Sequence, residues 1–270
     1  DPTLWNAEQP YLYTLTLQAG AETIEQKVGI RTISVEDGKI LINGKQVKFR
    51  GVNRHDSNPY SGAPVTRADV IRDLQLMKES NVNAIRTSHY PNAPYFPELC
   101  NEYGFYMIAE ADLESHGVGT LYTNDGHDCM GYIAQDDAWA ESILDRQKRN
   151  VIRDKNQSAV IFWSLGNESG YGGNFEDAGR WVKAYDPTRL LHYEASIYDS
   201  AGYHNDVSML DVMSRMYADT EWVKEYCEDR RMRKPFIQCE FIHAMGNGPG
   251  DIHDYMELMY KYDKFCGGFV

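Results

Sequence analysis

Short apolar runs alternate with amphipathic stretches along most of the 270-residue chain. Runs such as residues 159–165 and 236–239 have the length of buried strands, whereas residues 139–154 and 175–185 have the apolar spacing of helices. Strands that alternate with helices form a parallel sheet through right-handed crossovers. Seven such strands and the beginning of an eighth predict an α/β fold, a (β/α)8 TIM barrel truncated in its eighth unit. The predicted strands are residues 47–52, 83–86, 106–110, 159–165, 190–193, 211–216, 236–239 and 267–270, and the predicted helices are residues 67–80, 95–103, 139–154, 175–185 and 251–262.

The N-terminal region has a different pattern, which predicts the end of a β-sandwich. Residues 11–17 and 24–30 alternate apolar and polar positions, as half-buried strands do. A two-stranded unit is marginally stable in water. We therefore expect these two strands to complete a sandwich whose other strands precede them.

A hairpin connects this region to the predicted barrel. Residues 39–42 and 46–49 flank Asn43 and Gly44, a dipeptide typical of a tight β-turn. No helix follows the last predicted strand, and the first residue is not Met, so we expect the sequence to be an excerpt of a longer protein. The predicted domains are a sandwich end at residues 1–35 and a TIM-barrel domain, incomplete at its C-terminus, at residues 36–270.

Two glutamates, Glu168 and Glu240, each follow an apolar run and precede a loop that contains glycine. A carboxylate is costly to bury alone, so one at a strand tip indicates either a function or an ion pair with an arginine. Two carboxylates in one site suit the hydrolysis of a glycosidic bond, in which one protonates the leaving oxygen and the other is a nucleophile or base. The occurrence of two such glutamates favours the functional interpretation.

Other predicted strands also end in polar residues, which is where barrel enzymes place their chemistry. The sequence reads GVNRHD after the first strand, IRTSHYPN around the end of the second and EADLESHG from the end of the third. A single histidine at a strand end is usually structural, but so many polar strand ends favour a site. The positions collected in this way include His55, Arg86, His89, Glu114, His116, Asn167, Tyr217 and His243.

Composition restricts the class of ligand. A formal charge of -13 and a pI near 5.0 disfavour nucleic acid and anionic membrane surfaces as partners. The aromatic content of 12% is sufficient for a cleft in which rings stack on sugars. The five cysteines show neither a disulfide framework nor zinc-ligand spacing, so we interpret them as mainly buried thiols. No run approaches the roughly 18 apolar residues of a membrane span, and nothing in the sequence indicates a compartment.

The strings GVNRHD, IRTSHYPN, EADLESHG, WSLGNESG and CEFIHAMGN resemble the β-galactosidases of glycoside hydrolase family 2. In that family a jelly-roll, an immunoglobulin-like sandwich and a TIM barrel follow one another, which implies that residues 1–35 end the immunoglobulin-like domain. The resemblance implies a retaining exo-β-glycosidase that hydrolyses terminal non-reducing β-D-galactose residues. It makes Glu168, preceded by Asn167, the acid/base and Glu240 the nucleophile, with carboxyl groups about 5 to 5.5 Å apart.

The resemblance also implies roles for the other strand-end residues. His55 and His89 match histidines that contact the sugar, and His243 matches one near the nucleophile. Tyr217 matches a tyrosine that hydrogen-bonds the nucleophile. Arg86 matches an arginine beside it, and a core ion pair is the alternative for that residue. We therefore predict substrate-binding positions at His55, Arg86, His89, Asn167, Tyr217 and His243.

A metal site is a further implication of the resemblance. Glu114, His116 and Glu168 match residues that share Mg2+ in the family. Magnesium prefers oxygen ligands and a histidine ligand is unusual for it, so a hydrogen-bonded pair of Glu114 and His116 is the alternative. Some relatives also use Na+, for which the sequence indicates no ligands. The expected partners are a galactoside or oligosaccharide substrate and further copies of the parent enzyme in a homo-oligomer, without nucleic acid or membrane.

Three other interpretations remain open at this point. A β-glucuronidase or β-mannosidase of the same family would share both glutamates, although the NRHD and SHYPN strings favour a galactosidase. A non-catalytic carbohydrate-binding relative would have no reason to keep both carboxylates. A zinc-dependent hydrolase would need no second carboxylate at Glu240. Its ligands would come from His55, His89, Glu114 and His116.

Overall fold

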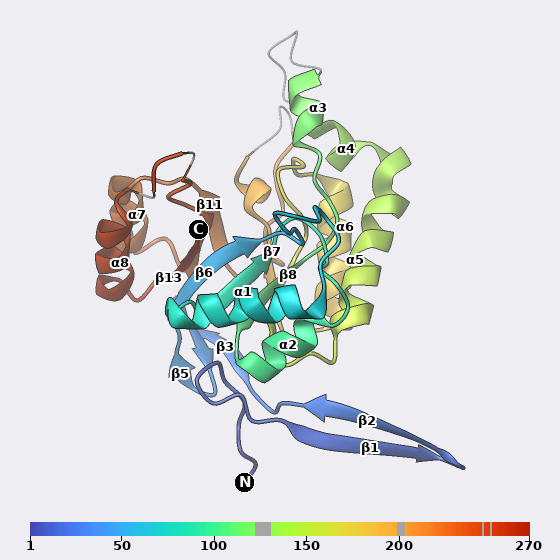
Figure 1. Ribbon diagram of the computed structural model, residues 1–270. Helices are drawn as coiled ribbons and strands as arrows, with labels where there is room; N and C mark the ends of the chain where they lie inside the picture. Colours follow the sequence, from blue (N-terminus) through green and yellow to red (C-terminus); the bar gives the residue numbers. More distant parts are fainter. Residues whose placement is uncertain (122–130, 199–202, 245, 249) are drawn as a thin grey trace.

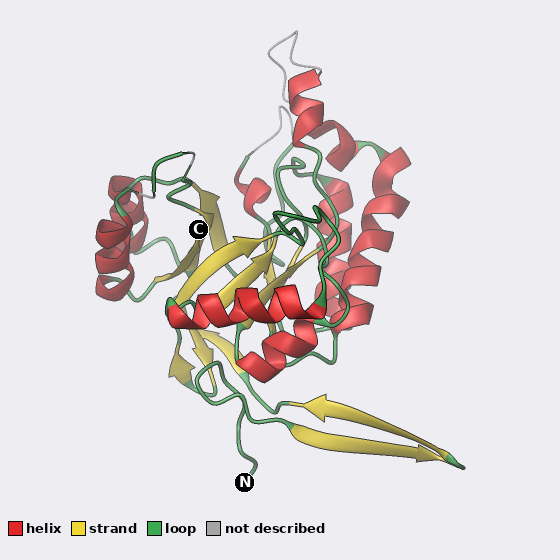
Figure 2. Ribbon diagram, in the orientation of Figure 1, coloured by secondary structure: helices red, strands yellow, loops and turns green. Residues whose placement is uncertain are grey.

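Eight parallel strands form the centre of the molecule and helices cover their outer side (Figures 1 and 2). The computed structural model describes residues 1–121, 131–198, 203–244, 246–248 and 250–270. The strand order around the sheet is β10-β9-β8-β7-β6-β13-β12-β11, so strands that follow one another in the chain are paired, except β10 and β11, and β13 pairs with β6. The predicted (β/α)8 barrel is thereby confirmed. Its strands are β6 (Phe49–Arg54), β7 (Ala84–Thr87), β8 (Tyr106–Glu110), β9 (Val160–Ser164), β10 (Leu190–His192), β11 (Met213–Met216), β12 (Phe236–Glu240) and β13 (Phe265–Phe269).

The barrel is nearly closed, because β10 and β11 are not joined in a strand ladder. We call this line between the two strands the seam. One backbone hydrogen bond crosses it, from Asp211 N to Leu191 O at 3.0 Å. The Asp211 carboxylate also accepts a bond from Leu191 N at 2.7 Å. A side chain thus replaces part of the missing ladder.

The five predicted helices are present, and each begins and ends within two residues of its predicted bounds. They correspond to α1 (Arg67–Glu79), α2 (Phe96–Tyr103), α5 (Ala140–Asp154), α6 (Gly173–Tyr185) and α8 (Ile252–Lys261). Helix α7 (Thr220–Glu228) was not predicted. Its signal was present in the sequence, since Asp219 caps it by accepting a bond from Trp222 N and Val223, Tyr226 and Cys227 are its buried positions. The remaining short helices are α3 (His116–Leu121), α4 (Gly131–Gln135), η2 (Asp137–Trp139) and η3 (Glu194–Ile197).

A small three-stranded sheet, β3 (Ile33–Glu36), β4 (Lys39–Ile42) and β5 (Lys45–Gln46), lies beside the start of β6 (Figure 1). The predicted turn at Asn43 and Gly44 joins β4 to β5, and both residues have positive φ, 54° and 73°. Asp37 and Gly38 form an equivalent turn between β3 and β4 that the sequence prediction did not include. The predicted strand at 46–49 is shorter than expected, because β5 ends at Gln46 and β6 begins at Phe49.

The first two strands, β1 (Tyr13–Ala19) and β2 (Glu22–Val28), form an antiparallel hairpin that extends away from the barrel (Figure 1). Its register places Leu15, Leu17 and Ile24 on one face, since Leu17 pairs with Ile24 and strand residues alternate between faces. These side chains are about half exposed, at 48%, 53% and 53%. An exposed apolar face is compatible with strands that complete a sandwich, and the domain boundary at residue 35 stays a prediction.

The predicted buried thiols are found where the structure describes them. Cys100, Cys227, Cys239 and Cys266 are buried and free, and Cys129 lies outside the described residues. In the described part of the chain, none of the helices combines the length and apolarity that a membrane crossing requires.

Candidate active site

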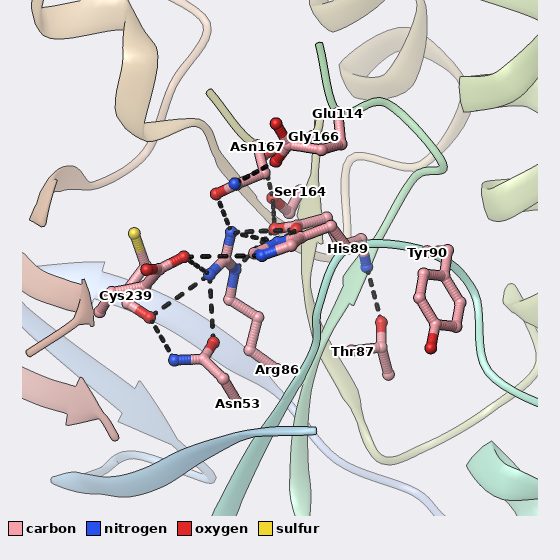
Figure 3. A network of polar contacts seen from close by, with 12 residues as sticks. Asn53, Arg86, Thr87, His89, Tyr90, Glu114, Ser164, Gly166, Asn167 and Cys239 are labelled. Carbon is pink, nitrogen blue, oxygen red and sulfur yellow. Dashed lines mark hydrogen bonds and ion pairs between the residues drawn. The ribbon is translucent and has the colours of Figure 1, made fainter. Parts of the chain in front are cut away.

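Arg86, at the C-terminal end of β7, is fully buried and connects the ends of several strands (Figure 3). Its guanidinium is held in a fork by Glu110, through Nε to Oε2 at 2.6 Å and Nη2 to Oε1 at 2.9 Å. Nη1 donates to Glu240 Oε1 at 2.9 Å, and Nη2 donates to Asn167 Oδ1 at 2.7 Å. Burial alone would lower the pKa of Arg86, but the carboxylates of Glu110 and Glu240 raise it above its ordinary value. Arg86 is therefore a permanent cation that links the strand ends carrying Glu240 and Asn167.

Glu110, at the end of β8, fixes both Arg86 and His89. His89 Nδ1 lies 2.9 Å from Glu110 Oε1. Burial by itself would raise the pKa of Glu110, but the charge of Arg86 and the hydrogen bond from His89 lower it below its ordinary value. An ionised carboxylate only accepts hydrogen bonds, so this contact places the proton of His89 on Nδ1. Nε2 of the same ring lies 3.8 Å from Glu240 Oε1.

The carboxylate of Glu240 is held at both oxygens. Arg86 binds Oε1, and the Tyr217 hydroxyl donates to Oε2. Tyr217 directly follows β11 with a φ of 52°, and its backbone N–H donates to Glu240 O at 2.9 Å. Burial, and then the hydrogen bond to Glu240, raise the pKa of the Tyr217 phenol, so it stays a neutral donor. The structure thus brings Arg86, Tyr217 and Glu240 together, as the sequence prediction grouped them.

A cavity of about 260 Å³ opens beside Glu240. The rings of His55 and His89 meet edge to face with their centroids 5.6 Å apart, and the ring of His243 lies over that of Tyr217 with centroids 6.4 Å apart. Burial, and then the positive charges nearby, lower the pKa of His55. None of the described residues that line the cavity is Lys or Arg. They are Asn53, His55, Ser88, His89, Tyr217, Glu240, Phe241, His243, Ala244 and Val270.

Glu168 follows β9 and belongs to a second group with Glu114 and His116. His116 Nδ1 is in contact with Glu168 Oε2, and Glu114 Oε2 accepts a bond from the side chain of Asn167. One potential ligand atom from each of Glu114, His116 and Glu168 lies within 4.8 Å of the others. The backbone N–H of His116 also donates to Glu114 Oε1 at 2.9 Å. The alternative interpretation, a hydrogen-bonded pair of Glu114 and His116, is therefore compatible with the structure too.

Glu114, His116 and Glu168 are the one set of three or more His, Cys, Asp or Glu side chains among the described residues that could hold an ion together. His55 and His89 are not part of it. The four residues named for a zinc-dependent hydrolase, His55, His89, Glu114 and His116, therefore do not form one group in the described part of the chain.

The two strand-end glutamates lie at the same end of the barrel, because both follow the C-terminal ends of parallel strands. Arg86 connects Glu240 to Asn167, the residue before Glu168. The Tyr217 hydroxyl donates to Glu240, and the negative charges of Glu240 and Glu168 both raise the pKa of Tyr217. The site therefore combines two carboxylates with a buried cation and an open cavity.

Two family models match the chain. Residues 33–270 match the model "Glycosyl hydrolases family 2, TIM barrel domain", and residues 1–31 match "Glycosyl hydrolases family 2". The chain belongs to glycosyl hydrolase family 2. The resemblance inferred from the five sequence strings is thereby confirmed at the level of the family.

Members of this family named β-galactosidase match the whole chain. The β-galactosidase of Actinobacillus pleuropneumoniae is 49% identical over 291 residues, which cover 100% of this chain and 29% of that protein. The β-galactosidase of Staphylococcus xylosus is 45% identical over 271 residues, which cover 100% of this chain and 27% of that protein. The chain thus spans less than a third of the length of these relatives.

Solved structures of the same fold include two β-glucuronidases. The β-D-glucuronidase of Dictyoglomus thermophilum matches with a TM-score of 0.78 at 24% identity, over 99% of this chain and 52% of that one. The β-glucuronidase of Faecalibacterium prausnitzii matches with a TM-score of 0.75 at 25% identity, over 99% of this chain and 49% of that one. These matches support the barrel fold.

Three strand-end residues were given no role in the sequence analysis. Glu110 begins the EADLESHG string, and Asn53, which accepts a bond from Arg86 Nη1 at 3.1 Å, lies within GVNRHD. Glu194 directly follows the predicted strand at 190–193. Asn53 and Glu110 stand in the strings that the strand-end rule collected, without a role of their own. The same rule applied after residues 190–193 would have added Glu194.

Proposed function

We propose that the protein carrying this chain is a retaining exo-β-glycosidase that hydrolyses terminal non-reducing β-D-galactose residues. The observation that carries the proposal is the placement of Glu240, whose two oxygens are oriented by Arg86 and Tyr217, at the same barrel end as Glu168. The identity of up to 49% with proteins named β-galactosidase supports the choice of sugar. Because the chain spans under a third of those proteins, the activity belongs to the whole polypeptide.

In the proposed reaction Glu240 is the nucleophile and Glu168 is the acid/base. Glu240 attacks the anomeric carbon while Glu168 gives its proton to the departing glycosidic oxygen, and a covalent glycosyl intermediate forms on Glu240. Glu168 then removes a proton from water, which attacks the anomeric carbon and releases Glu240. Two displacements retain the anomeric configuration. Glu240 is a free carboxylate before the first displacement and after the second, and Arg86 stabilises this anionic form.

A neutral sugar suits the cavity better than a uronic acid. The described lining residues include Glu240 but no Lys or Arg, so the carboxylate of a glucuronide would meet a negative charge without a cation. Arg86 is itself occupied by Glu110, Glu240 and amide oxygens. A β-glucuronidase is nevertheless the second candidate, since the two solved structures reported above carry that name.

We further propose that Glu114, His116 and Glu168 hold Mg2+. Two carboxylates and an imidazole lie close enough to share one ion, and the carboxylate oxygens are the ligand type that magnesium prefers. A bound divalent cation would supply positive charge beside Glu168 and fix its orientation. No described residue is assigned to Na+, which stays a prediction of the resemblance alone.

Hydrolysis of aryl glycosides by the natural polypeptide that carries this chain tests the proposal. We expect cleavage of the β-D-galactoside, with the β-D-glucuronide and β-D-mannoside cleaved far more slowly. Glu240→Gln should be inactive, since an amide is a poor nucleophile, whereas Glu98→Gln, on the exposed face of α2, should match the natural protein.

The outcomes separate the parts of the proposal. Preferential cleavage of the glucuronide or mannoside would overturn the choice of sugar and leave the mechanism in place. Activity that persists in Glu240→Gln would exclude the two-glutamate mechanism. Binding of galactosides without turnover would favour a non-catalytic relative.

A further inference from the structure

Side chains make contacts across the seam between β10 and β11, and the last of these contacts is made to the residue that precedes Tyr217. Nε2 of His192, a residue of β10, lies 2.8 Å from the hydroxyl oxygen of Ser214 on β11. Further along the seam, Glu194 Oε1 accepts a hydrogen bond from the backbone N–H of Met216 at 3.1 Å. The other neighbouring strands of the barrel are paired through backbone ladders. At this seam, Glu194 therefore takes the place of a missing backbone acceptor.

Glu194 is buried, with 3% of its surface exposed, and it begins the short helix η3 directly after β10 and Tyr193. Met216 is buried as well. A buried N–H without an acceptor is destabilising, so the Met216 amide needs this carboxyl. The Tyr198 hydroxyl donates to the same oxygen at 3.4 Å.

Met216 directly precedes Tyr217, and the backbone here departs from a regular strand. The pairing of β11 with β12 shifts register between Ser214 and Met216. Tyr217 has a φ of 52°, a region that residues other than glycine adopt only at an energetic cost. The surrounding contacts must therefore hold the chain at Tyr217 in place. Two of them are the Met216 N–H bond to Glu194 and the Tyr217 N–H bond to Glu240 O.

We propose that Glu194 is a positioning residue for the nucleophile, because its carboxyl fixes Met216 and thereby places the Tyr217 hydroxyl on Glu240. Glu194 accepts a hydrogen bond from the Met216 N–H, Met216 is bonded to Tyr217 in the chain, and the Tyr217 hydroxyl donates to Glu240 Oε2. The consequence for catalysis rests on the proposed function, whereas the placement of Tyr217 does not.

The chemistry of Glu194 indicates which substitution preserves this role. Burial, and then the negative charge of Glu168, raise the pKa of Glu194 to about 7. The protonated and ionised carboxyl groups both keep an oxygen that accepts the Met216 N–H. The amide oxygen of glutamine can do the same, but leucine offers no acceptor and aspartate is one methylene too short.

Crystal structures of Glu194→Gln and Glu194→Leu test the placement without reference to activity. We expect Tyr217 to stay on Glu240 in Glu194→Gln and to leave it in Glu194→Leu. If the leucine variant does not fold, Glu194→Asp takes its place. A Tyr217 hydroxyl that stays on Glu240 in Glu194→Leu, or in Glu194→Asp with the Met216 N–H no longer bonded to position 194, would overturn the proposal. This result does not depend on whether the natural protein cleaves a glycoside.

Kinetics then test whether the effect passes through Tyr217. In the natural polypeptide, Glu194→Leu should lower kcat for the aryl galactoside by about 10- to 100-fold, with a much smaller change in KM, because a displaced reacting group costs rate more than binding. Glu194→Gln should stay within about threefold. In a Tyr217→Phe background the same Glu194→Leu change should cost less than about threefold.

Equal losses in both backgrounds would show that Glu194 acts independently of Tyr217 and would contradict the proposal. A wild-type protein that cleaves none of the aryl glycosides would overturn the proposed function instead. The crystal structures would still decide the role of Glu194.

Discussion

Arg86 has no exposed surface, so protein groups must balance its charge. Glu110 balances it through two hydrogen bonds and Glu240 through one. The sequence left two alternatives for this residue, a core ion pair or a contact with the nucleophile. The structure shows both contacts at once, because a guanidinium carries five donors in a planar fork and can serve two carboxylates together.

A first prediction concerns this ion pair. Arg86→Met should lower the free energy of unfolding by about 3 to 5 kcal/mol, because it leaves Glu110 buried without a counter-charge. Urea denaturation followed by tryptophan fluorescence measures the loss. The double variant Arg86→Met, Glu110→Met buries no charge at these two positions and should be more stable than Arg86→Met. A double variant that is less stable than the single one would contradict this account.

At the scale of elements, the loops after β8 and β9 form one unit. Asn167 N donates to Leu113 O at 2.8 Å, and the side chain of Asn167 binds Glu114. These bonds hold Glu114 and His116, from one loop, beside Glu168, from the other. The arrangement of the proposed metal site therefore depends on two loops that are separate in the sequence.

The metal proposal predicts a partial response to chelation. Removing divalent cations with EDTA should lower kcat for the aryl galactoside without abolishing it, and added Mg2+ should restore it, because the two carboxylates that break the bond remain. Glu114→Gln should weaken Mg2+ binding in calorimetry of the metal-free protein, with Glu98→Gln as the unchanged control. Complete loss on chelation, restored by zinc alone, would favour the zinc-dependent alternative.

The elements differ in how far the sequence predicted them. The Asn43–Gly44 turn and the long helices have strong local signals, a dipeptide suited to positive φ and a sustained apolar spacing. Helix α7 was missed, although the Asp219 cap and the spacing of its buried positions are local signals too. The shift of β6 to Phe49–Arg54 has no local signal, since a continuous apolar run does not mark where pairing with the neighbouring strands begins.

At the scale of the whole molecule, the β1–β2 hairpin stands apart from the barrel (Figure 1). We expect its apolar face to be covered in the natural polypeptide, because a two-stranded unit is marginal in water and Leu15, Leu17 and Ile24 are about half exposed. Hydrogen exchange measured by mass spectrometry should then show the backbone amides of residues 13–28 protected. Exchange as fast as in a free peptide would contradict the sandwich prediction. The expected homo-oligomer stays a prediction.

The sequence by itself determined the barrel and the two glutamates at its strand ends. Periodicity and strand-end position are local properties, so they can be detected in one chain without knowing its folded form. Only the tertiary structure decided which strand ends meet. Arg86 and Glu240 are 154 positions apart, and Glu194 reaches Met216 across a seam that no periodicity marks. These contacts arise when the sheet curves into a barrel, because closure brings distant strand ends around one axis.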